Sequence, residues 1–335
     1  MLPQHTTLSV THWANSSENH TTKLLPYIGR IQELKLRMTV EDYTDLWQML
    51  SPTQLANLTS LHLGFPDTEV LQTAVQDWRS VTLFKLVKRL RRLALTSPQD
   101  FTPTLLSLDV PWGQLIELHI DLENLSFQTA VSILQKSSAL EGLVLRVYES
   151  EEAVGDFISG RILLPHLKTL RITVNDASMF HALIVPTLTS LHITETQMNS
   201  QDLSPDILHF LATSGCSLTS FTYKRATRSP CPLTLLRDLL GVLHGVTRFA
   251  APDVMFCEEV MRDFACCALL PRVQDLGFCA PTREALVHML EQRMQVEAKR
   301  GAVTLRRVNG TDHDRAHGPL RSTLFFYTLA GTSYS

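Results

Sequence analysis

The chain has 335 residues, of which 44% are hydrophobic and 19% are charged, and its formal net charge is −3. This composition supplies enough apolar material for a large core and excludes a chain that is disordered throughout. The small net charge argues against nucleic acid or an acidic membrane as a general partner.

Targeting signals and cysteine spacing indicate an intracellular protein. No apolar run reaches the roughly 18 residues that a membrane span needs, and residues 1–6 have neither the basic nor the apolar region of a signal peptide. The six cysteines form no C-x-x-C pair, so zinc binding lacks its usual spacing. We therefore expect free thiols in a reducing compartment and a cytoplasmic or nuclear location.

One spaced pattern, apolar-x-x-apolar-x-apolar, recurs along the chain. Its return about every 27 residues is typical of a leucine-rich-repeat solenoid. A solenoid can grow as one array because each repeat contacts only its neighbours. The ten copies begin at Ile31, Leu58, Leu90, Leu115, Leu140, Leu167, Leu188, Leu218, Val246 and Val273.

Each copy predicts a short strand. Residues at the fourth and sixth places, such as Leu143 and Leu145, point the same way on a strand, and residues at the third and fifth places point the opposite way. Between the strands, apolar residues recur at helical spacing, as at Phe127, Val131 and Leu134. The sequence therefore predicts an α/β fold: an irregular leucine-rich-repeat solenoid (a horseshoe) with parallel strands on the concave face and helices on the convex face.

In chain order we expect three parts. Residues 1–23 form an N-terminal segment, residues 24–308 form the array of about ten repeats, and residues 309–335 form a C-terminal tail. Within the array, Ser204 and Pro205 are expected as the N-cap and first residue of a helix. Further helices are expected to open near Pro232 and Pro281.

The repeat is irregular at its ninth place. Leucine-rich units usually carry Asn there, where its side chain holds the turn, but only the copy that begins at Leu167 has one, at Asn175. We therefore expect the turns to be held by other means. An extra pattern, Leu105-x-x-Leu108-x-Val110, predicts either a hairpin or a strand outside the array.

Two features of the tail leave alternatives open. The stretch from His313 to His317 loosely echoes a zinc-binding helix, but flanking glycines break helices, so we expect no metal there. The apolar stretch 324–329 predicts either a docked closing strand or an aggregation-prone tail.

Two stretches resemble F-box proteins of mushroom-forming fungi. Residues 111–120, PWGQLIELHI, resemble their P-W-x-Q-L-x-x-L-x-L segment, and residues 286–293, LVHMLEQR, resemble the helix that closes their repeat array. The resemblance covers roughly residues 24–310. In that family an N-terminal F-box docks onto the Skp1 adaptor of a cullin ubiquitin ligase, and the repeats select the protein to be ubiquitinated.

The printed sequence shows no L-P-x-E pattern of an F-box. The resemblance therefore implies the substrate-recognition part of such a receptor, and Skp1 is expected as a partner only if an F-box lies upstream of this chain. The alternative is a free-standing leucine-rich-repeat binding protein with no ubiquitin-ligase role. No G-x-x-x-x-G-K loop or G-x-S-x-G elbow occurs, so we expect no enzyme and no cofactor.

The outward places of the strands form the expected binding face, although a solvated face without a dedicated partner stays open. Arg92 with Glu117, and Arg248 with Asp275, stand in adjacent repeats and could pair. Outward histidines stand two or more strands apart, too far to share a metal ion. The expected partner-binding residues are Glu33, Lys35, His62, Arg92, Glu117, His119, Arg171, His192, Arg248 and Asp275.

A basic cluster overlaps the start of the third copy. Residues 85–92 carry five lysines and arginines, and no acidic residue stands from 80 to 98. Nucleic-acid or import-receptor binding is one interpretation. The alternative, which we favour, is a solvated helix end that runs into a strand, because Leu86, Leu90, Leu93 and Leu95 are typical of core positions. We therefore expect a target protein, not yet identified, rather than nucleic acid or a membrane.

Overall fold

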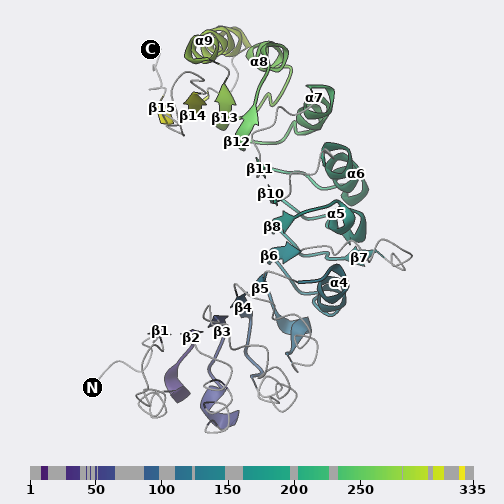
Figure 1. Ribbon diagram of the computed structural model, residues 1–335, viewed down its shortest axis with the longest axis vertical. Helices are drawn as coiled ribbons and strands as arrows, with labels where there is room; N and C mark the ends of the chain where they lie inside the picture. Colours follow the sequence, from purple (N-terminus) through teal and green to yellow (C-terminus); the bar gives the residue numbers. More distant parts are fainter. Residues whose placement is uncertain are drawn as a thin grey trace. The chain divides into compact units, whose positions relative to one another are not determined.

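A computed structural model of the chain describes residues 9–13, 28–37, 43, 46, 50, 52–64, 87–97, 110–122, 125–147, 161–196, 203–225, 233–280, 282–300, 305–312 and 324–328. The chain divides into two compact units, an N-terminal unit (Met1–Leu167) and a C-terminal unit (Lys168–Ser335). In the described residues, both units repeat one motif, a tight turn followed by a parallel strand (Figure 1).

The sheet of the N-terminal unit runs in chain order, and each described strand pairs in parallel with the next. Its strands are β1 (Ser9–Trp13), β2 (Glu33–Arg37), β3 (Ser60–Gly64), β4 (Arg92–Ser97), β5 (Glu117–Leu122) and β6 (Gly142–Val147). The other described elements are η1 (Ile28–Arg30), η2 (Pro52–Leu55), η6 (Trp112–Gln114), α4 (Phe127–Gln135) and β7 (Ile162–Leu163).

The C-terminal unit has the same plan with longer helices. Figure 1 shows its helices on one side of its strands. The strands are β8 (Thr169–Val174), β9 (Leu183–Ile184), β10 (Ser190–Glu195), β11 (Ser220–Arg225), β12 (Arg248–Met255), β13 (Asp275–Ala280), β14 (Arg307–Asp312) and β15 (Leu324–Thr328). The helices are α5 (Ser178–Ala182), α6 (Ser204–Ser214), α7 (Leu233–Val242), α8 (Glu258–Ala265) and α9 (Arg283–Arg300).

The core lies where the repeated pattern places it. In all ten copies the residues at the fourth and sixth places are at most 3% exposed. The places between them are half-buried or exposed, apart from Gly277, which is buried. Strand pairing also joins equivalent places, so that Leu118 lies opposite Leu93 and Leu143. The predicted α/β leucine-rich-repeat architecture is therefore confirmed.

Nine of the ten copies begin with the same turn, which the sequence pattern did not include. The amide of the first-place residue donates to the carbonyl oxygen three residues earlier in nine copies, at 3.0–3.4 Å. The residue that carries this carbonyl is at most 5% exposed in each case. In the copy that begins at Leu115 it is Trp112, which explains in physical terms why a bulky apolar residue stands before that repeat.

Within each of the two units, a carbonyl ladder joins successive repeats. The carbonyl oxygen of the second-place residue in one repeat accepts the second-place and third-place amides of the next repeat, at 2.7–3.1 Å. In four repeats the second-place residue is threonine, and its hydroxyl donates to the same carbonyl oxygen at 3.1 Å. These threonines are Thr59, Thr189, Thr219 and Thr247. The threonine hydroxyls hold strand starts in a chain that has the usual asparagine in only one copy.

Helix boundaries follow local chemistry. α6 begins at Ser204 with Leu203 as its N-cap, so the expected N-cap at Ser204 was wrong by one residue. α6 ends at Gly215, whose φ of 61° lies in the left-handed region that glycine tolerates at a helix C-terminus. α9 is capped by Thr282, whose Oγ1 accepts the amide of Ala285 at 3.1 Å.

The C-terminal unit continues beyond the tenth copy. β14 pairs in parallel with β13, and Leu305 and Val308 fill the first and fourth places of one more repeat. The sequence pattern missed this repeat because Gly310 stands at its apolar sixth place. β15 then pairs antiparallel to β14, so the stretch 324–328 docks as a closing strand, one of the two alternatives left open.

Three sequence-based expectations concern other segments. β1 lies within the expected N-terminal segment 1–23, and β14 and β15 reach into the expected tail 309–335. The division of the chain into those parts and the array 24–308 stays a prediction. Leu105, Leu108 and the stretch His313 to His317 lie outside the described residues.

Candidate functional site

The outward side chains of β2 to β6 form a surface that we call the N-terminal strand face. On this surface the residues at the same place of successive repeats lie side by side in a row. Pairing places Glu33 beside Ser60, Ser60 beside Arg92, and Arg92 beside Glu117. At the fifth place, the neighbours in order are Lys35, His62, Ala94, His119 and Val144. All six expected site residues of this unit therefore lie on one side of one sheet, half-buried or exposed.

The charges of the N-terminal strand face are paired within the protein. Lys35 Nζ lies 2.9 Å from Glu33 Oε1, and the predicted pair of Arg92 with Glu117 is confirmed at 3.3 Å. Two places further along the strands, Arg146 Nε lies 2.8 Å from Asp121 Oδ1. Because each of these cations faces a carboxylate, this face has little net charge to offer a partner.

The basic cluster at residues 85–92 is also used within the N-terminal unit. Arg89 Nη1 donates to Asn57 Oδ1 at 3.3 Å, and Arg91 Nη1 donates to the carbonyl oxygen of Gln114 at 3.0 Å. These contacts tie adjacent repeats together, and Lys85 lies outside the described residues. The described arginines are therefore engaged in structural contacts.

His62 is a half-buried histidine of the N-terminal strand face. Its Nε2 lies 3.2 Å from Thr96 Oγ1 on the adjacent strand. Burial lowers the pKa of His62, and His119 and Lys35 nearby lower it further. His62 is therefore neutral at pH 7 and serves as a hydrogen-bonding group rather than a charge.

The outward side chains of β8, β10, β11 and the start of β12 form the C-terminal strand face. One row holds Thr169, Ser190, Ser220 and Arg248, with Asp275 on the next strand. The adjacent row holds Arg171, His192 and Thr222. Lys224 lies two residues further along β11 than Thr222. The four expected site residues of this unit also share one side of one sheet.

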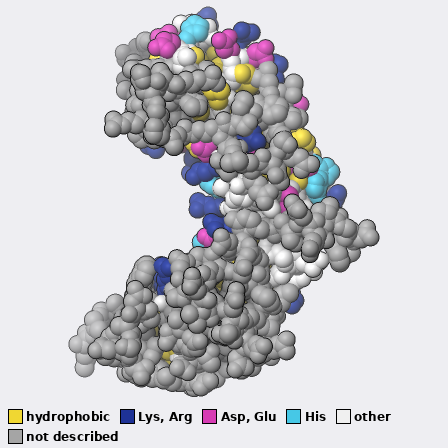
Figure 2. All heavy atoms as spheres, in the orientation of Figure 1, with side chains coloured by type: hydrophobic (Ala, Val, Ile, Leu, Met, Phe, Trp, Pro, Cys, Tyr) yellow, Lys and Arg dark blue, Asp and Glu magenta, His cyan; other side chains and the backbone are white. Residues whose placement is uncertain are grey.

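The cations of the C-terminal strand face are not neutralised as those of the N-terminal strand face are. Arg171, Lys224 and Arg248 are exposed, and no ion pair joins any of them to a carboxylate in the described part of the chain. The expected pair of Arg248 with Asp275 does not form, although the two residues lie opposite each other. Figure 2 shows Lys, Arg and His side chains gathered along the strand side of this unit.

His192 lies among these cations. Its Nε2 is 3.4 Å from Thr194 Oγ1, and the ring is half-buried. Burial, followed by the positive charges of Arg171 and Lys224, lowers the pKa of His192 from 6.5 to about 4. The ring is therefore neutral at pH 7, and the positive charge of the face comes from the lysine and arginines.

Sequence reasoning missed a buried ion pair beneath the C-terminal strand face. Glu195, 4% exposed, accepts hydrogen bonds from Tyr223 Oη at 2.9 Å and from Arg225 Nε at 3.0 Å. The eighth places of the three preceding repeats carry Leu122, Val147 and Val174, whereas the next repeat carries Arg225. Opposite charges at the eighth places of two adjacent repeats, which strand pairing puts side by side, were the available signal.

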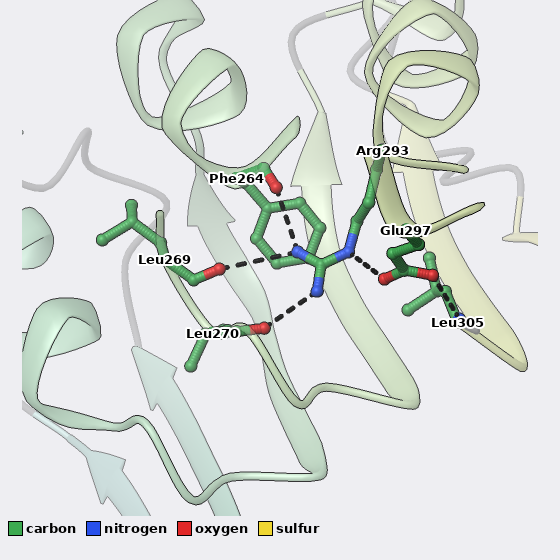
Figure 3. A network of polar contacts seen from close by, with 6 residues as sticks. All are labelled: Phe264, Leu269, Leu270, Arg293, Glu297 and Leu305. Atoms are coloured by element: carbon green, nitrogen blue, oxygen red, sulfur yellow. Dashed lines mark hydrogen bonds and ion pairs between the residues drawn. The ribbon is translucent and has the colours of Figure 1, made fainter. Parts of the chain in front are cut away.

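A second buried network anchors α9 (Figure 3). Arg293 Nε donates to Glu297 Oε1 at 2.8 Å, and its other nitrogens donate to the carbonyl oxygens of Phe264 at 3.0 Å and Leu270 at 2.9 Å. Glu297 Oε2 accepts the amide of Leu305 at 3.1 Å. Because both charged residues are at most 1% exposed, the network is structural and joins α8, α9 and the entry to β14.

Three further features of the described residues concern metal-binding groups, cysteines and helix length. These residues contain no group of three or more His, Cys, Asp or Glu placed to hold a metal ion. Their five cysteines are free thiols, and burial raises the pKa of Cys216 and Cys267. None of their helices combines the length and apolarity that a membrane crossing requires.

The repeat geometry defines the class of protein: an α/β leucine-rich-repeat solenoid with polar strand faces. No protein-family model and no curated protein sequence matches the chain. The leucine-rich repeat-containing protein LegL7 from Legionella pneumophila is 13% identical, with 91% of each chain covered and a TM-score of 0.43. A protein from Bacteroides fragilis is 11% identical, with 83% of this chain and 69% of that chain covered and a TM-score of 0.39.

Proposed function

We propose that this chain is a protein-interaction scaffold that binds a partner protein through its strand faces. The observation that carries the proposal is the register of the outward side chains, which lie side by side on adjacent strands in both units. Parallel strands with a buried opposite side hold such side chains rigidly, and repeat proteins use these surfaces for binding. The proposal includes no catalytic activity.

Trp substitutions that block the strand faces test this proposal. His119→Trp and Thr222→Trp add bulk to the N-terminal and C-terminal strand faces, and Gln128→Trp and Ala212→Trp add the same bulk to exposed helix positions as matched controls. We expect affinity capture to lose a specific partner with at least one strand-face variant and to retain it with both helix variants. Loss with the helix variants alone would contradict the proposal.

We further propose that the chain is the substrate-recognition part of an F-box-type ubiquitin-ligase receptor. The resemblance of residues 111–120 and 286–293 to fungal F-box proteins supports this finer proposal. Trp112 is buried in the turn that opens its repeat. Trp112 therefore has a structural role in the repeat, and its presence is no evidence for or against Skp1 binding.

Transcript mapping and Skp1 binding test the ligase role. We expect the 5′ end of the transcript to encode an F-box in frame with this chain, and the longer product, but not the chain printed here, to retain Skp1. An authentic start at Met1 would contradict the ligase role and leave the alternative, a free-standing leucine-rich-repeat binding protein. Skp1 retention by this chain alone would also contradict the proposal that the F-box binds Skp1 and the repeats bind the substrate.

A further inference from the structure

The two strand faces differ in charge although they share one architecture. On the N-terminal strand face each of the cations Lys35, Arg92 and Arg146 lies within 3.3 Å of a carboxylate oxygen. On the C-terminal strand face the cations Arg171, Lys224 and Arg248 are exposed and have no ion pair with a carboxylate of the described residues. The nearby carboxylate of Glu195 points to the opposite side of the sheet, where Tyr223 and Arg225 bind it.

The spacing of these cations suits an extended chain. Arg171 on β8 and Lys224 on β11 are separated by two strand spacings, about 10 Å, and Arg248 lies one strand further, four places toward the start of the strand. Alternate side chains of an extended peptide are about 7 Å apart, so several acidic side chains can reach these cations together.

Hydroxyl groups, together with the neutral ring of His192, stand on the strands between the cations. Ser190, Ser220 and Thr222 stand on β10 and β11, in register with Arg248 or Arg171. Hydroxyls donate hydrogen bonds to carboxylates, and bonds of this charge-assisted kind are stronger than neutral ones. The only acidic side chain in register with this set, Asp275, lies beyond Arg248 at one edge of the face, within the described residues.

We propose that the C-terminal strand face binds an acidic, extended segment of a partner protein, with its carboxylates on Arg171, Lys224 and Arg248. The inference rests on the proposed function and specifies the chemistry of the partner. Nucleic acid fits this face less well. Its outward places carry serine and threonine rather than the aromatic platforms on which bases stack, and the whole chain has a net charge of −3.

Binding of fluorescein-labelled octaglutamate to the full chain, followed by fluorescence anisotropy, tests the proposal. We expect the triple variant Arg171→Glu, Lys224→Glu, Arg248→Glu to bind at least tenfold more weakly. The matched variant Arg262→Glu, Arg272→Glu, Lys299→Glu makes the same change in net charge at exposed positions off this face, and we expect less than a twofold effect. Circular dichroism checks that both variants fold, and a triple glutamine variant replaces the first if it does not.

Three outcomes would overturn the proposal: no binding of octaglutamate, equal weakening by both triple variants, or tighter binding of an eight-residue oligothymidylate than of octaglutamate. The captured partner separates this inference from the proposed function. A partner lost with Thr222→Trp but retained by the strand-face triple variant would uphold the interaction scaffold and refute the acidic segment. A partner retained by every strand-face variant would refute both.

Discussion

At the scale of single residues, position in the repeat decides chemistry. His192 occupies the fifth place of its repeat, between Arg171 and Thr222 on the adjacent strands, with Lys224 diagonal to it. The same imidazole at an isolated exposed position would titrate near 6.5, but burial and the two cations lower its pKa to about 4. The His192 ring therefore stays neutral at pH 7 within the positively charged C-terminal strand face.

The lowered pKa of His192 predicts a pH dependence of stability. The unfolded chain binds a proton at His192 below about pH 6.5, whereas the folded chain resists protonation until about pH 4, so this residue reduces stability as the pH falls between these values. We expect histidine NMR titration to give a pKa near 4 that rises in Lys224→Gln. His192→Gln should make thermal unfolding less pH-dependent in this window, and a titration near 6.5 would contradict the structure.

Arg293 illustrates the opposite case, a charge that the fold needs. Its guanidinium lies 4.2 Å from the centre of the Phe264 ring and satisfies carbonyl oxygens of the segment after α8. Two non-glycine residues of that segment, Cys267 and Leu270, have positive φ values of 55° and 46°. The hydrogen bonds from Arg293 help to hold this uncommon backbone conformation.

Replacement of Arg293 by methionine should be strongly destabilising. The variant leaves Glu297 charged and buried without its partner, which costs about 3–5 kcal/mol of unfolding free energy. Chemical denaturation measures the change, and Arg262→Met, at an exposed position of α8, is the matched control with an expected effect of about 0.5 kcal/mol or less. The double variant Arg293→Met, Glu297→Met should recover part of the loss. Equal stability of the two single variants would show that the network does not form.

At the scale of elements, the turn and the carbonyl ladder characterise the repeat together with its buried apolar side chains. The turn places one more buried residue three positions before the first place, and the ladder then fixes the next strand in register. Neither feature needs a particular side chain, because both consist of main-chain hydrogen bonds. The threonines add a side-chain bond where the sequence allows it.

Removal of the threonine hydroxyls tests the ladder. The triple variant Thr189→Val, Thr219→Val, Thr247→Val keeps the side-chain shape but deletes three hydrogen bonds of 3.1 Å. We expect a loss of about 1–3 kcal/mol in total, measured by chemical denaturation. The control triple Thr169→Val, Thr173→Val, Thr222→Val alters outward hydroxyls of β8 and β11 and should change stability by under about 1 kcal/mol. Equal effects would mean that the hydroxyl bonds contribute nothing specific.

At the scale of the whole molecule, net charge conceals the feature that distinguishes the two strand faces. The chain has 30 basic and 33 acidic residues, a balance that predicts no particular partner. Within the described residues, Asp275 is the one acidic side chain in register with this set, and it forms no ion pair with Arg248, while Glu195 is buried beneath the face. The proposed affinity for an acidic segment follows from this local placement.

Strand positions and their inward or outward orientation were predictable from the sequence alone. A period of two along each strand and a recurring apolar pattern leave few alternatives for residues such as Leu143 and His192, because only one register buries every leucine. The pattern failed at Gly310, where a repeat lacks its apolar sixth-place residue, and it did not detect β1.

Only the tertiary structure decided which outward charges are paired and which are free. Arg92 and Glu117 stand at the third places of adjacent repeats, and so do Arg248 and Asp275. The first two residues form an ion pair, and the second two do not. Exposed ion pairs contribute so little free energy that side-chain conformation, rather than strand register, determines whether they form. The sequence determined the scaffold because burial of apolar side chains dominates folding, and the charge of each face was settled by contacts too weak to leave a pattern.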